Sequence, residues 1–236
     1  IAELVSMQAV PASVKTVNLA GEPLSTSLVN DIYATGTVER VNDLYGPSED
    51  TTYSTWTRRL ANVRATIGRP IYNTQAYVLD KHKQPVPVGV PGELFLSGAG
   101  VTRGYRNQPE LTAEKYIHNP FSSSADARMY STGDLVRYQP DGNLEYIGRI
   151  DHQIKLRGFR IELGEIESKL LDHEAVDKAV VIIREDQPGD KRLVAYIVTD
   201  KPPESSELKA HLQASLPAYM VPAAFVFMTS VPLTPN

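Results

Sequence analysis

Residues 148–167, GRIDHQIKLRGFRIELGEIE, divide this sequence into two parts with different patterns. The stretch is charged and punctuated by glycine, which is typical of a connector that absorbs backbone rotation as a hinge. A solvated linker that runs into a helix is the plainer interpretation. Because the patterns on its two sides differ, we expect a domain boundary near Asp151, between residues 1–150 and residues 151–236.

The part before this stretch begins with an α/β pattern. Apolar alternation predicts strands over residues 14–19 and 38–44, and residues 24–33 predict a helix with Ser25 as its cap. Strands that alternate with a helix favour a parallel α/β layer. From residue 68 to 147, short apolar runs between Pro and Gly turns predict instead a small antiparallel sheet or barrel, with one helix near residues 109–116.

The part after Asp151 has the pattern of a compact α+β module. Helical periodicity covers residues 161–171 and 204–216, and Pro217 ends the second helix. Strong β runs cover residues 179–183, 193–198 and 225–228. The predicted fold class is therefore α/β followed by α+β.

Composition limits the classes of function. Hydrophobic residues are 42% and charged residues 22% of the sequence, which is ordinary for a soluble globular protein. The net charge of −4 is unlike the basic footprint of a nucleic-acid binder, and no apolar run approaches the roughly 20 residues of a membrane span. We therefore expect neither nucleic acid nor a membrane as a partner. The lack of cysteine excludes a disulfide framework, a thiolate nucleophile and a Cys-based zinc site.

The two ends suggest a piece of a longer protein. Ile1 is not an initiator methionine, and no cationic signal region follows it. The last residues, Pro235 and Asn236, look like part of a loop. We expect a cytoplasmic fragment that begins within a longer chain.

Residues 43–52 are the first segment that indicates chemistry. A strand ends there in Tyr45-Gly46-Pro47, and ligands of open α/β sheets bind at the carboxyl ends of strands. Ser48 can bond a phosphate oxygen, and Glu49 is a hard oxygen ligand suited to Mg²⁺. Taken alone, a turn with solvated acids is the plainer interpretation.

Two further segments carry weak signals of the same kind. Residues 130–135 form a hydroxyl-rich turn that ends in Asp134, whose carboxylate can face a ribose diol, although Asp after Gly is common in turns. Residues 92–105 are Gly-rich but lack the Lys of a phosphate-cradling loop. They also lack the glycine that a nucleophile elbow around Ser97 needs, since Phe95 stands there. Strands and tight turns are the favoured interpretation of this segment.

Together and in this order, these segments resemble the motifs of adenylate-forming enzymes and, within that superfamily, of adenylation domains of nonribosomal peptide synthetases. Residues 43–49 resemble the Asn-x-Tyr-Gly-Pro-Thr-Glu motif, residues 92–105 the Gly-Glu-Leu…Arg-Gly-Tyr motif and residues 130–135 the Tyr-x-Thr-Gly-Asp motif. Residues 148–167 match the hinge motif almost letter by letter, and residues 216–222 match the late Leu-Pro-x-Tyr-Met-x-Pro motif.

The resemblance implies an adenylate-forming fold. Residues 1–150 correspond to the later part of the large N-terminal subdomain, an α/β layer plus a small β-barrel that holds the nucleotide and substrate side. Residues 151–236 correspond to the small, mobile α+β C-terminal subdomain, cut before its catalytic lysine.

The resemblance also implies roles for single residues. The implied catalytic residues are Glu49, which binds Mg²⁺, Asp151, which is the hinge, and Lys155. Lys155 lies with Gly158 on the loop that meets the carrier's pantetheine arm. At the nucleotide, Tyr45 stacks on adenine, and Asp43 (usually Asn in the family) accepts a hydrogen bond from the amino group of adenine. Asp134 holds the ribose hydroxyls. The remaining implied nucleotide contacts are Gly46, Ser48 at the α-phosphate, Tyr146 and Arg149.

The implied reaction has two steps. An amino-acid carboxylate attacks the α-phosphate of MgATP and releases pyrophosphate. The phosphopantetheine thiol of a peptidyl carrier protein then takes the acyl group, and a neighbouring condensation domain is the further implied partner. The implied substrate pocket favours a small neutral amino acid such as alanine and is lined by Asn18, Ala20, Leu44, Thr52 and Tyr53.

Two alternatives stay open. One is an acyl- or aryl-CoA ligase, or a stand-alone amino acid–carrier protein ligase, although residues 157–167 favour the peptide synthetase. The other is a truncated, non-catalytic fragment, because the family's phosphate loop lies upstream of residue 1 and its catalytic lysine beyond Asn236. We expect residues 1–236 alone to adenylate poorly. The presence of Glu49, Asp134 and Arg149 argues against degeneracy.

Overall fold

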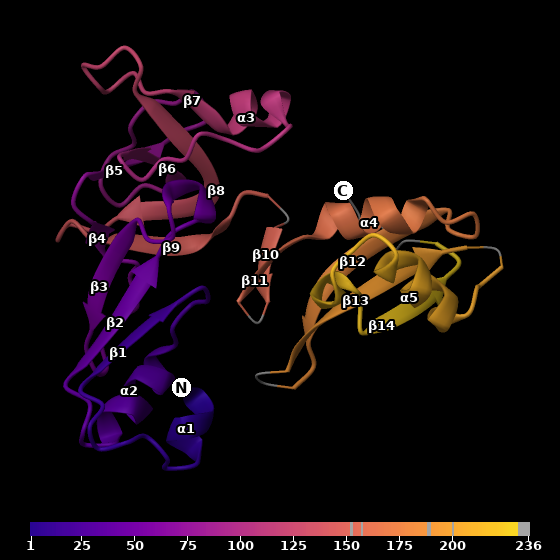
Figure 1. Ribbon diagram of the computed structural model, residues 1–236, viewed down its shortest axis with the longest axis horizontal. Coiled ribbons are helices and arrows are strands. Elements are labelled where there is room, and N and C mark those ends of the chain that lie inside the picture. Colours follow the sequence, from indigo (N-terminus) through magenta and orange to yellow (C-terminus); the bar gives the residue numbers. More distant parts are fainter. Residues whose placement is uncertain (152, 157, 188–189, 200, 231–236) are drawn as a thin grey trace. The chain divides into compact units, whose positions relative to one another are not determined.

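The computed structural model describes residues 1–151, 153–156, 158–187, 190–199 and 201–230. It divides into two units, Ile1–Asp151 and His152–Asn236, each with its own sheets (Figure 1). No helix in the described ranges is both long enough and apolar enough to cross a membrane.

The first sheet of the first unit is built on the predicted parallel pair of strands, β1 (Thr16–Ala20) and β2 (Arg40–Tyr45). Between them runs α2 (Thr26–Ala34), and the Ser25 hydroxyl accepts a hydrogen bond from the amide of Leu28, as expected for its cap. The buried face of α2 packs on the apolar face of the two strands. This cluster consists of Val17, Leu24, Val29, Ile32, Val38 and Val41.

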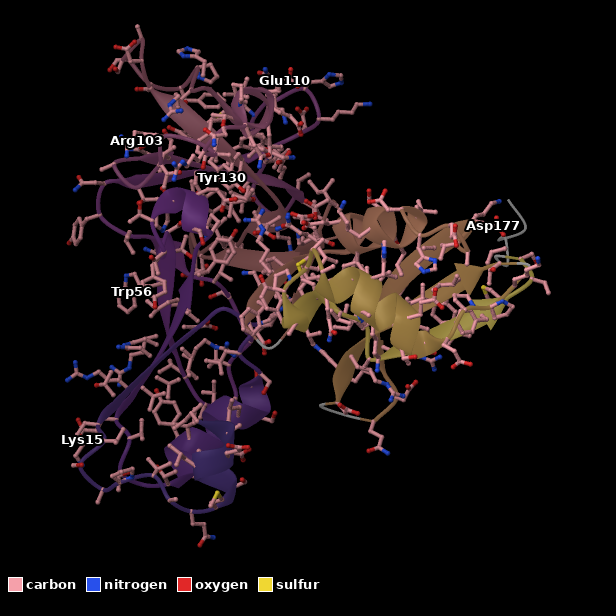
Figure 2. All side chains as sticks on the ribbon, turned by 45° about the vertical axis from the view of Figure 1, so that its right-hand side comes forward. Lys15, Trp56, Arg103, Glu110, Tyr130 and Asp177 are labelled. Carbon is pink, nitrogen blue, oxygen red and sulfur yellow. The ribbon has the colours of Figure 1, made fainter. Side chains whose placement is uncertain are left out.

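Three elements of this region were not predicted. A short helix, α1 (Ala2–Ser6), packs beside α2. Two antiparallel strands, β3 (Thr55–Arg59) and β4 (Arg69–Pro70), extend the sheet to the order β1-β2-β3-β4. In β3, Trp56 is 48% exposed and points outward from the sheet (Figure 2). The β3 sequence, Thr-Trp-Thr-Arg-Arg, has no apolar run, and such a run is the signal that would have predicted a strand there.

The second sheet of the first unit is antiparallel, as predicted. Its order is β5-β6-β8-β7, with β9 paired to the other half of β8. Its core contains Val78, Leu94, Leu96, Val136 and Leu144, together with Tyr45 from the end of β2. The predicted helix is present as α3 (Pro109–Lys115). The strands are β5 (Thr74–Leu79), β6 (Gly92–Gly98), β7 (Tyr116–His118), β8 (Arg128–Tyr138) and β9 (Leu144–Arg149).

A close backbone approach joins the two sheets of this unit. Gly68 and Leu144 form an isolated bridge, in which the amide of Leu144 donates to the Gly68 carbonyl at 2.7 Å. Gly68 has a φ of +78°, and a Cβ there would lie 1.9 Å from the carbonyl oxygen of Trp56. Only glycine fits this position, which holds β3 against β9.

The second unit is an α+β module, as predicted. Its sheet has the order β12-β13-β14, with β12 and β13 antiparallel and β13 and β14 parallel. Apolar residues of α4 and α5 pack with the sheet in one core. Its elements are α4 (Leu163–Leu171), β12 (Lys178–Glu185), β13 (Lys191–Val198), α5 (Ser205–Gln213), the short 3₁₀ turn η2 (Ala218–Met220) and β14 (Ala224–Met228).

The predicted connector is in part a hairpin. Strands β10 (Gln153–Leu156) and β11 (Phe159–Glu162) pair across a turn at Gly158, whose φ is +79°. The prediction that a helix begins at Ile161 was therefore wrong by two residues, because Ile161 belongs to β11 and is fully buried in the same core as α4. The prediction that the last helix reaches residue 216 was also too long, since α5 ends at Gln213.

Candidate functional site

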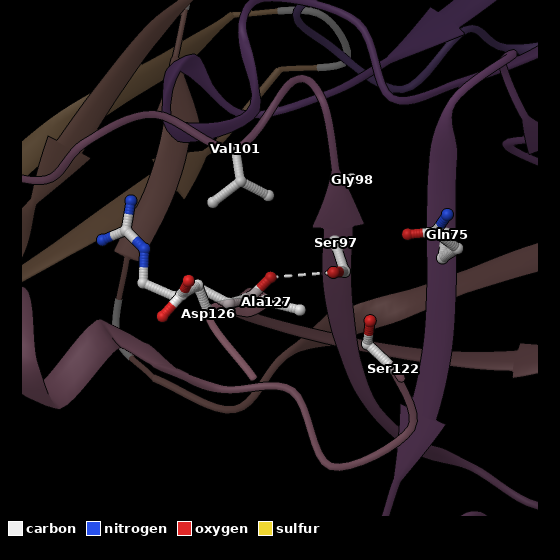
Figure 3. Close-up of a pocket in the computed structure, with 8 residues that line it drawn as sticks. Gln75, Ser97, Gly98, Val101, Ser122, Asp126 and Ala127 are labelled. Carbon is white, nitrogen blue, oxygen red and sulfur yellow. Dashed lines mark hydrogen bonds between the residues drawn. The ribbon is translucent and has the colours of Figure 1, made fainter. Parts of the chain in front are cut away.

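A polar hollow of about 410 Å³ lies beside β6, but none of the predicted site residues lines it (Figure 3). Two of its polar side chains, those of Ser97 and Arg128, are already bound to backbone carbonyl groups. The Ser97 hydroxyl donates to the Arg128 carbonyl at 2.7 Å, and the Arg128 guanidinium donates to the carbonyl of Thr102 at 2.9 Å. We therefore place the candidate site elsewhere, at the residues that the sequence indicated.

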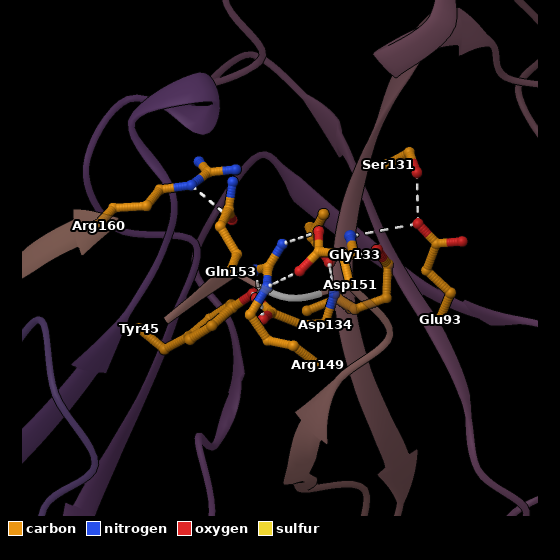
Figure 4. Close-up of polar contacts among 11 residues, drawn as sticks. Tyr45, Glu93, Ser131, Gly133, Asp134, Arg149, Asp151, Gln153 and Arg160 are labelled. Atoms are coloured by element: carbon orange, nitrogen blue, oxygen red, sulfur yellow. Dashed lines mark hydrogen bonds and ion pairs between the residues drawn. The ribbon is translucent and has the colours of Figure 1, made fainter. Parts of the chain in front are cut away.

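Four of those residues meet at the junction of β2, β8 and β9 (Figure 4). The Tyr45 hydroxyl donates to one oxygen of Asp134, although the two residues are 89 positions apart. Arg149 donates to the other oxygen of Asp134 at 2.8 Å, and to both oxygens of Asp151 at 2.6 Å each. The structure thus joins the ends of three predicted motifs in one hydrogen-bonded network.

Strand pairing explains why Asp134 and Arg149 meet. They are directly opposite in the antiparallel register of β8 and β9, where facing side chains are neighbours. Both side chains are buried, at 4% and 10% exposure, whereas the Asp151 side chain is 41% exposed. A buried carboxylate is stable only when it is paired and hydrogen-bonded, and here Arg149 and Tyr45 supply both.

The same charges shift the pKa values of their neighbours. Burial and then Asp134 raise the pKa of Tyr45 well above its ordinary value, so that its hydroxyl remains a donor. Burial and Asp134 also raise the pKa of Tyr146 to about 12. Burial opposes the charge of Arg149, but Asp151 and Asp134 outweigh it and raise its pKa. These raised pKa values keep the hydroxyls of Tyr45 and Tyr146 protonated and Arg149 charged at neutral pH.

Gly133 lets the backbone approach this network. It has a φ of +71°, and a Cβ would lie 2.7 Å from both an Arg149 nitrogen and an Asp151 oxygen. Its carbonyl accepts from the amide of Ile150 at 2.9 Å. A side chain at this position would separate the Arg149–Asp151 pair.

The turn after β2 carries Ser48 and Glu49 in the short 3₁₀ helix η1 (Ser48–Asp50). Ser48 is exposed, and Glu49 is 8% exposed and accepts a 2.7 Å hydrogen bond from the Tyr105 hydroxyl. Gly46 allows the turn, because a Cβ would lie 2.6 Å from the backbone nitrogen of Ser54. No group of three or more metal-ligating side chains occurs in the described ranges. A single carboxylate still fits Mg²⁺, which proteins usually bind through one or two carboxylates plus substrate phosphates.

Two buried polar groups in this turn have no hydrogen-bond partner within the described chain, namely the carboxyl of Asp50 and the hydroxyl of Ser54. Asp50 is 1% exposed, and burial raises its pKa; the nearby Ser54 hydroxyl opposes this shift without reaching hydrogen-bond geometry. Between them, Thr51 and Thr52 have φ values of +50° and +79°, which β-branched residues rarely adopt. Such strain persists where surrounding contacts enforce it, and it often marks a functional site.

Asp43 has a partner within the chain that the sequence did not suggest. Its carboxylate pairs with Arg59 of β3 at 2.8 Å, with 3% and 11% of the Arg59 and Asp43 side chains exposed. Burial raises the pKa of Asp43, and the bond to Arg59 offsets part of that shift. Sequence inspection missed Arg59 because β3 itself was missed. The contact of Asp43 with an adenine amino group stays a prediction, as does stacking by Tyr45, whose ring is only 7% exposed.

Three of the five predicted pocket residues share one open face of the first sheet. Asn18 and Ala20 are two residues apart on β1 and so lie on the same face, and Ala20 is opposite Leu44 of β2. The other face is covered by α2. Thr52 and Tyr53 follow in the exposed part of the next turn. The pleat therefore brings the three strand residues together on the side away from α2.

The remaining predicted residues belong to the second unit. Lys155 is half-buried in β10, and Gly158 is exposed at the hairpin turn with open space around its Cα. His152 and Arg157 of the same motif, and residues 231–236 with Pro235 and Asn236, lie outside the described residues.

Comparison with known proteins identifies the family. The sequence model of the AMP-binding enzymes matches residues 3–106, and that of the AMP-binding enzyme C-terminal domain matches residues 165–236. The chain belongs to the AMP-binding enzyme family. The resemblance inferred from the motifs is thereby confirmed, as is the adenylate-forming fold.

Relatives of this AMP-binding chain include very large proteins. It is 57% identical to one of the linear gramicidin synthase proteins of Brevibacillus parabrevis over 99% of its own length, and it is 50% identical to a dimodular nonribosomal peptide synthase of Bacillus subtilis over 92%. It spans only 5% and 9% of these two proteins. Among solved structures, an artificially fused adenylation–PCP di-domain from Klebsiella oxytoca is 31% identical with a TM-score of 0.77, covering 94% of this chain and 41% of that one.

Proposed function

We propose that the protein containing this AMP-binding chain activates an amino acid with ATP as an aminoacyl-adenylate and transfers it to the phosphopantetheine thiol of a carrier protein. The observation that carries this proposal is the network of Tyr45, Asp134, Arg149 and Asp151, which joins three motifs typical of such enzymes. The synthase relatives and the adenylation–PCP structure support nonribosomal peptide synthesis, and with it antibiotic or other secondary-metabolite production.

The chain's own residues bind and orient in this scheme. Asp134 accepts from the ribose hydroxyls, and its bond to Arg149 fixes the orientation of the carboxylate for that task. Ser48, exposed on η1, donates to an α-phosphate oxygen. A magnesium ion held by Glu49 supplies neutralisation of phosphate charge. The gain in rate comes from positioning and from charges that are already in place.

The second step uses the region where the two units join. Asp151 is the last residue of the first unit, and Arg149 holds both its carboxylate oxygens. In our proposal the backbone at Asp151 rotates between the steps, and Lys155 and Gly158 then face the pantetheine arm. The positive φ of Gly158 and the open space around it suit a turn that lets a thin arm pass close to the backbone.

The open face of β1 and β2 is the proposed substrate wall. Asn18 accepts a 2.8 Å hydrogen bond from Asn42, so its polar group is held within the sheet. Ala20 and Leu44 are apolar, and none of the five proposed lining residues carries a charge. This lining suits a small neutral amino acid such as alanine, although one methylene changes selectivity by only about 1–3 kcal/mol.

ATP–pyrophosphate exchange with each proteinogenic amino acid, run on the complete protein, tests the proposal. We expect exchange with one or a few small neutral amino acids, and a loss on the order of 100-fold in Glu49→Gln, which removes a charge at the reacting phosphates. Asp141→Asn is the matched control, since Asp141 lies in the exposed β8–β9 turn, where its carboxylate accepts from the amide and the side chain of Asn143. Exchange with fatty or aromatic acids alone, or full activity of Glu49→Gln, refutes the proposal.

A further inference from the structure

Tyr105 contacts the proposed magnesium ligand, and neither the motifs nor the reaction scheme gives it a role. Its hydroxyl donates to Glu49 Oε1 at 2.7 Å, across 56 residues of sequence. Building on the function proposed above, we propose that Tyr105 is a positioning residue that holds the Glu49 carboxylate in the orientation that binds the divalent cation.

The loop that carries Tyr105 is itself firmly held. The Tyr105 amide donates to the Thr112 hydroxyl at 2.9 Å, and its ring packs edge-on against Tyr116 with 5.6 Å between centroids. Gly104 has a φ of +132°, and a Cβ there would lie 2.3 Å from a Thr112 methyl group. The phenol therefore approaches Glu49 from a support with little freedom of its own.

Two more hydrogen bonds tie the same loop to the turn that carries Glu49. The amide of Thr102 donates to the Glu49 carbonyl at 2.9 Å, and the Thr51 hydroxyl donates to the Gly100 carbonyl at 2.7 Å. Backbone and side chain of Glu49 are thus fixed by one neighbouring loop. Thr51, whose φ is +50°, is itself one of the residues that these hydrogen bonds hold.

The energetic argument is one of preorganisation. A glutamate side chain loses up to roughly 1.5–2 kcal/mol of rotamer freedom when it is ordered, and Tyr105 removes that freedom before a cation arrives. A carboxylate has about four lone-pair positions, so one oxygen can accept from a phenol while the group also binds a cation. Groups that hold metal-binding side chains in place typically change metal affinity about 10- to 100-fold when they are removed.

Tyr105→Phe is the direct test, because it keeps the ring packed on Tyr116 and removes only the hydroxyl. Tyr138→Phe is the matched control, since its hydroxyl also makes one partly buried bond, to the Ala76 carbonyl at 2.9 Å. In the complete protein with a non-hydrolysable ATP analogue, Mn²⁺ binding is followed by electron paramagnetic resonance. We expect the Mn²⁺ dissociation constant to rise about tenfold in Tyr105→Phe and to stay unchanged in Tyr138→Phe.

Further variants separate the possible failures. If Tyr105→Phe does not fold, Thr112→Val tests the same support, because it removes the acceptor of the Tyr105 amide while keeping the phenol; a rise of about two- to threefold is expected. An unchanged or lower dissociation constant in the folded variants overturns the proposal, since the hydroxyl is then neutral or competes with the cation. If Glu49→Gln also binds Mn²⁺ normally, the role of Glu49 in the proposed function fails with it.

Discussion

Replacing Arg59 by alanine tests whether the buried Asp43–Arg59 pair is a structural ion pair of the first sheet. Arg59 contacts Asp43 at 2.8 Å and also donates to the Leu24 carbonyl at 2.7 Å, with 3% of its side chain exposed. Its loss leaves a buried carboxylate and a buried carbonyl without their donor. Breaking a buried pair by removing one partner costs about 3–5 kcal/mol, so we expect Arg59→Ala to lose that much free energy of unfolding.

Two further variants separate the charge from the packing. Asp43→Asn keeps an oxygen acceptor for Arg59, and we expect a loss of about 1–2 kcal/mol. Asp43→Leu combined with Arg59→Met removes both charges and keeps the volume, which is often nearly neutral for buried pairs. Because the Leu24 carbonyl still loses its donor, we expect this double variant to remain about 1 kcal/mol below the parent.

Urea unfolding followed by tryptophan fluorescence measures these differences. Trp56 is the single tryptophan of the sequence and lies in β3, the same strand as Arg59. Its emission therefore reports the unfolding of this sheet and not of the second unit. A loss below about 1 kcal/mol in Arg59→Ala, or no recovery in the double variant, refutes the reasoning.

The pH dependence gives an independent check. Burial already raises the pKa of Asp43, and Arg59 opposes that rise, so the pKa rises further in Arg59→Ala. A carboxyl whose pKa is raised in the folded state binds its proton there more tightly than in the unfolded state. Stability is then lost as pH rises from the unfolded pKa through the folded one. We therefore expect Arg59→Ala to lose more free energy of unfolding, relative to the parent, at pH 7 than near pH 4.

Three other substitutions test single features. Burial raises the pKa of Asp50 in the folded state. The parent therefore loses stability as pH rises from the unfolded pKa of Asp50 through its folded pKa, whereas an asparagine at this position does not titrate, so Asp50→Asn should gain stability relative to the parent between pH 4 and pH 7. Gly133→Ala combines a left-handed backbone with a 2.7 Å approach to Asp151, and we expect a loss of about 2–4 kcal/mol in urea unfolding. Ser25→Ala removes the cap of Leu28 in α2 and should cost about 1 kcal/mol in the same assay.

Matched controls make these outcomes decisive. Gly36 has a φ of +75°, close to that of Gly133, but a Cβ there meets nothing within 4 Å; Gly36→Ala should therefore cost only the backbone strain of about 1–2 kcal/mol. Equal losses at Gly36 and Gly133 contradict the proposed crowding at Asp151. A parallel pH profile of Asp50→Asn and the parent excludes a raised pKa at Asp50, and an unchanged stability of Ser25→Ala excludes a working cap.

Local patterns predicted many, but not all, of the regular elements of the two units. The helix after Ser25 and the strands around it were predicted because a cap residue and apolar periodicity are properties of neighbouring residues. β3 was missed because its sequence, Thr-Trp-Thr-Arg-Arg, has no apolar run and is a strand only through its pairing with β2. The β10–β11 hairpin was interpreted as a connector because Gly158 and the charges around it also suit a linker.

The sequence by itself determined the family, the mixed fold class and the motif residues Tyr45, Glu49, Asp134 and Arg149, because motif order and periodicity are written along the chain. Only the tertiary structure decided which groups these residues meet. Arg59 on Asp43, Tyr105 on Glu49 and Tyr45 on Asp134 join residues 16, 56 and 89 positions apart. Such partners depend on strand register and loop packing, and buried charges and donors must find whichever complementary group the fold brings within hydrogen-bond distance.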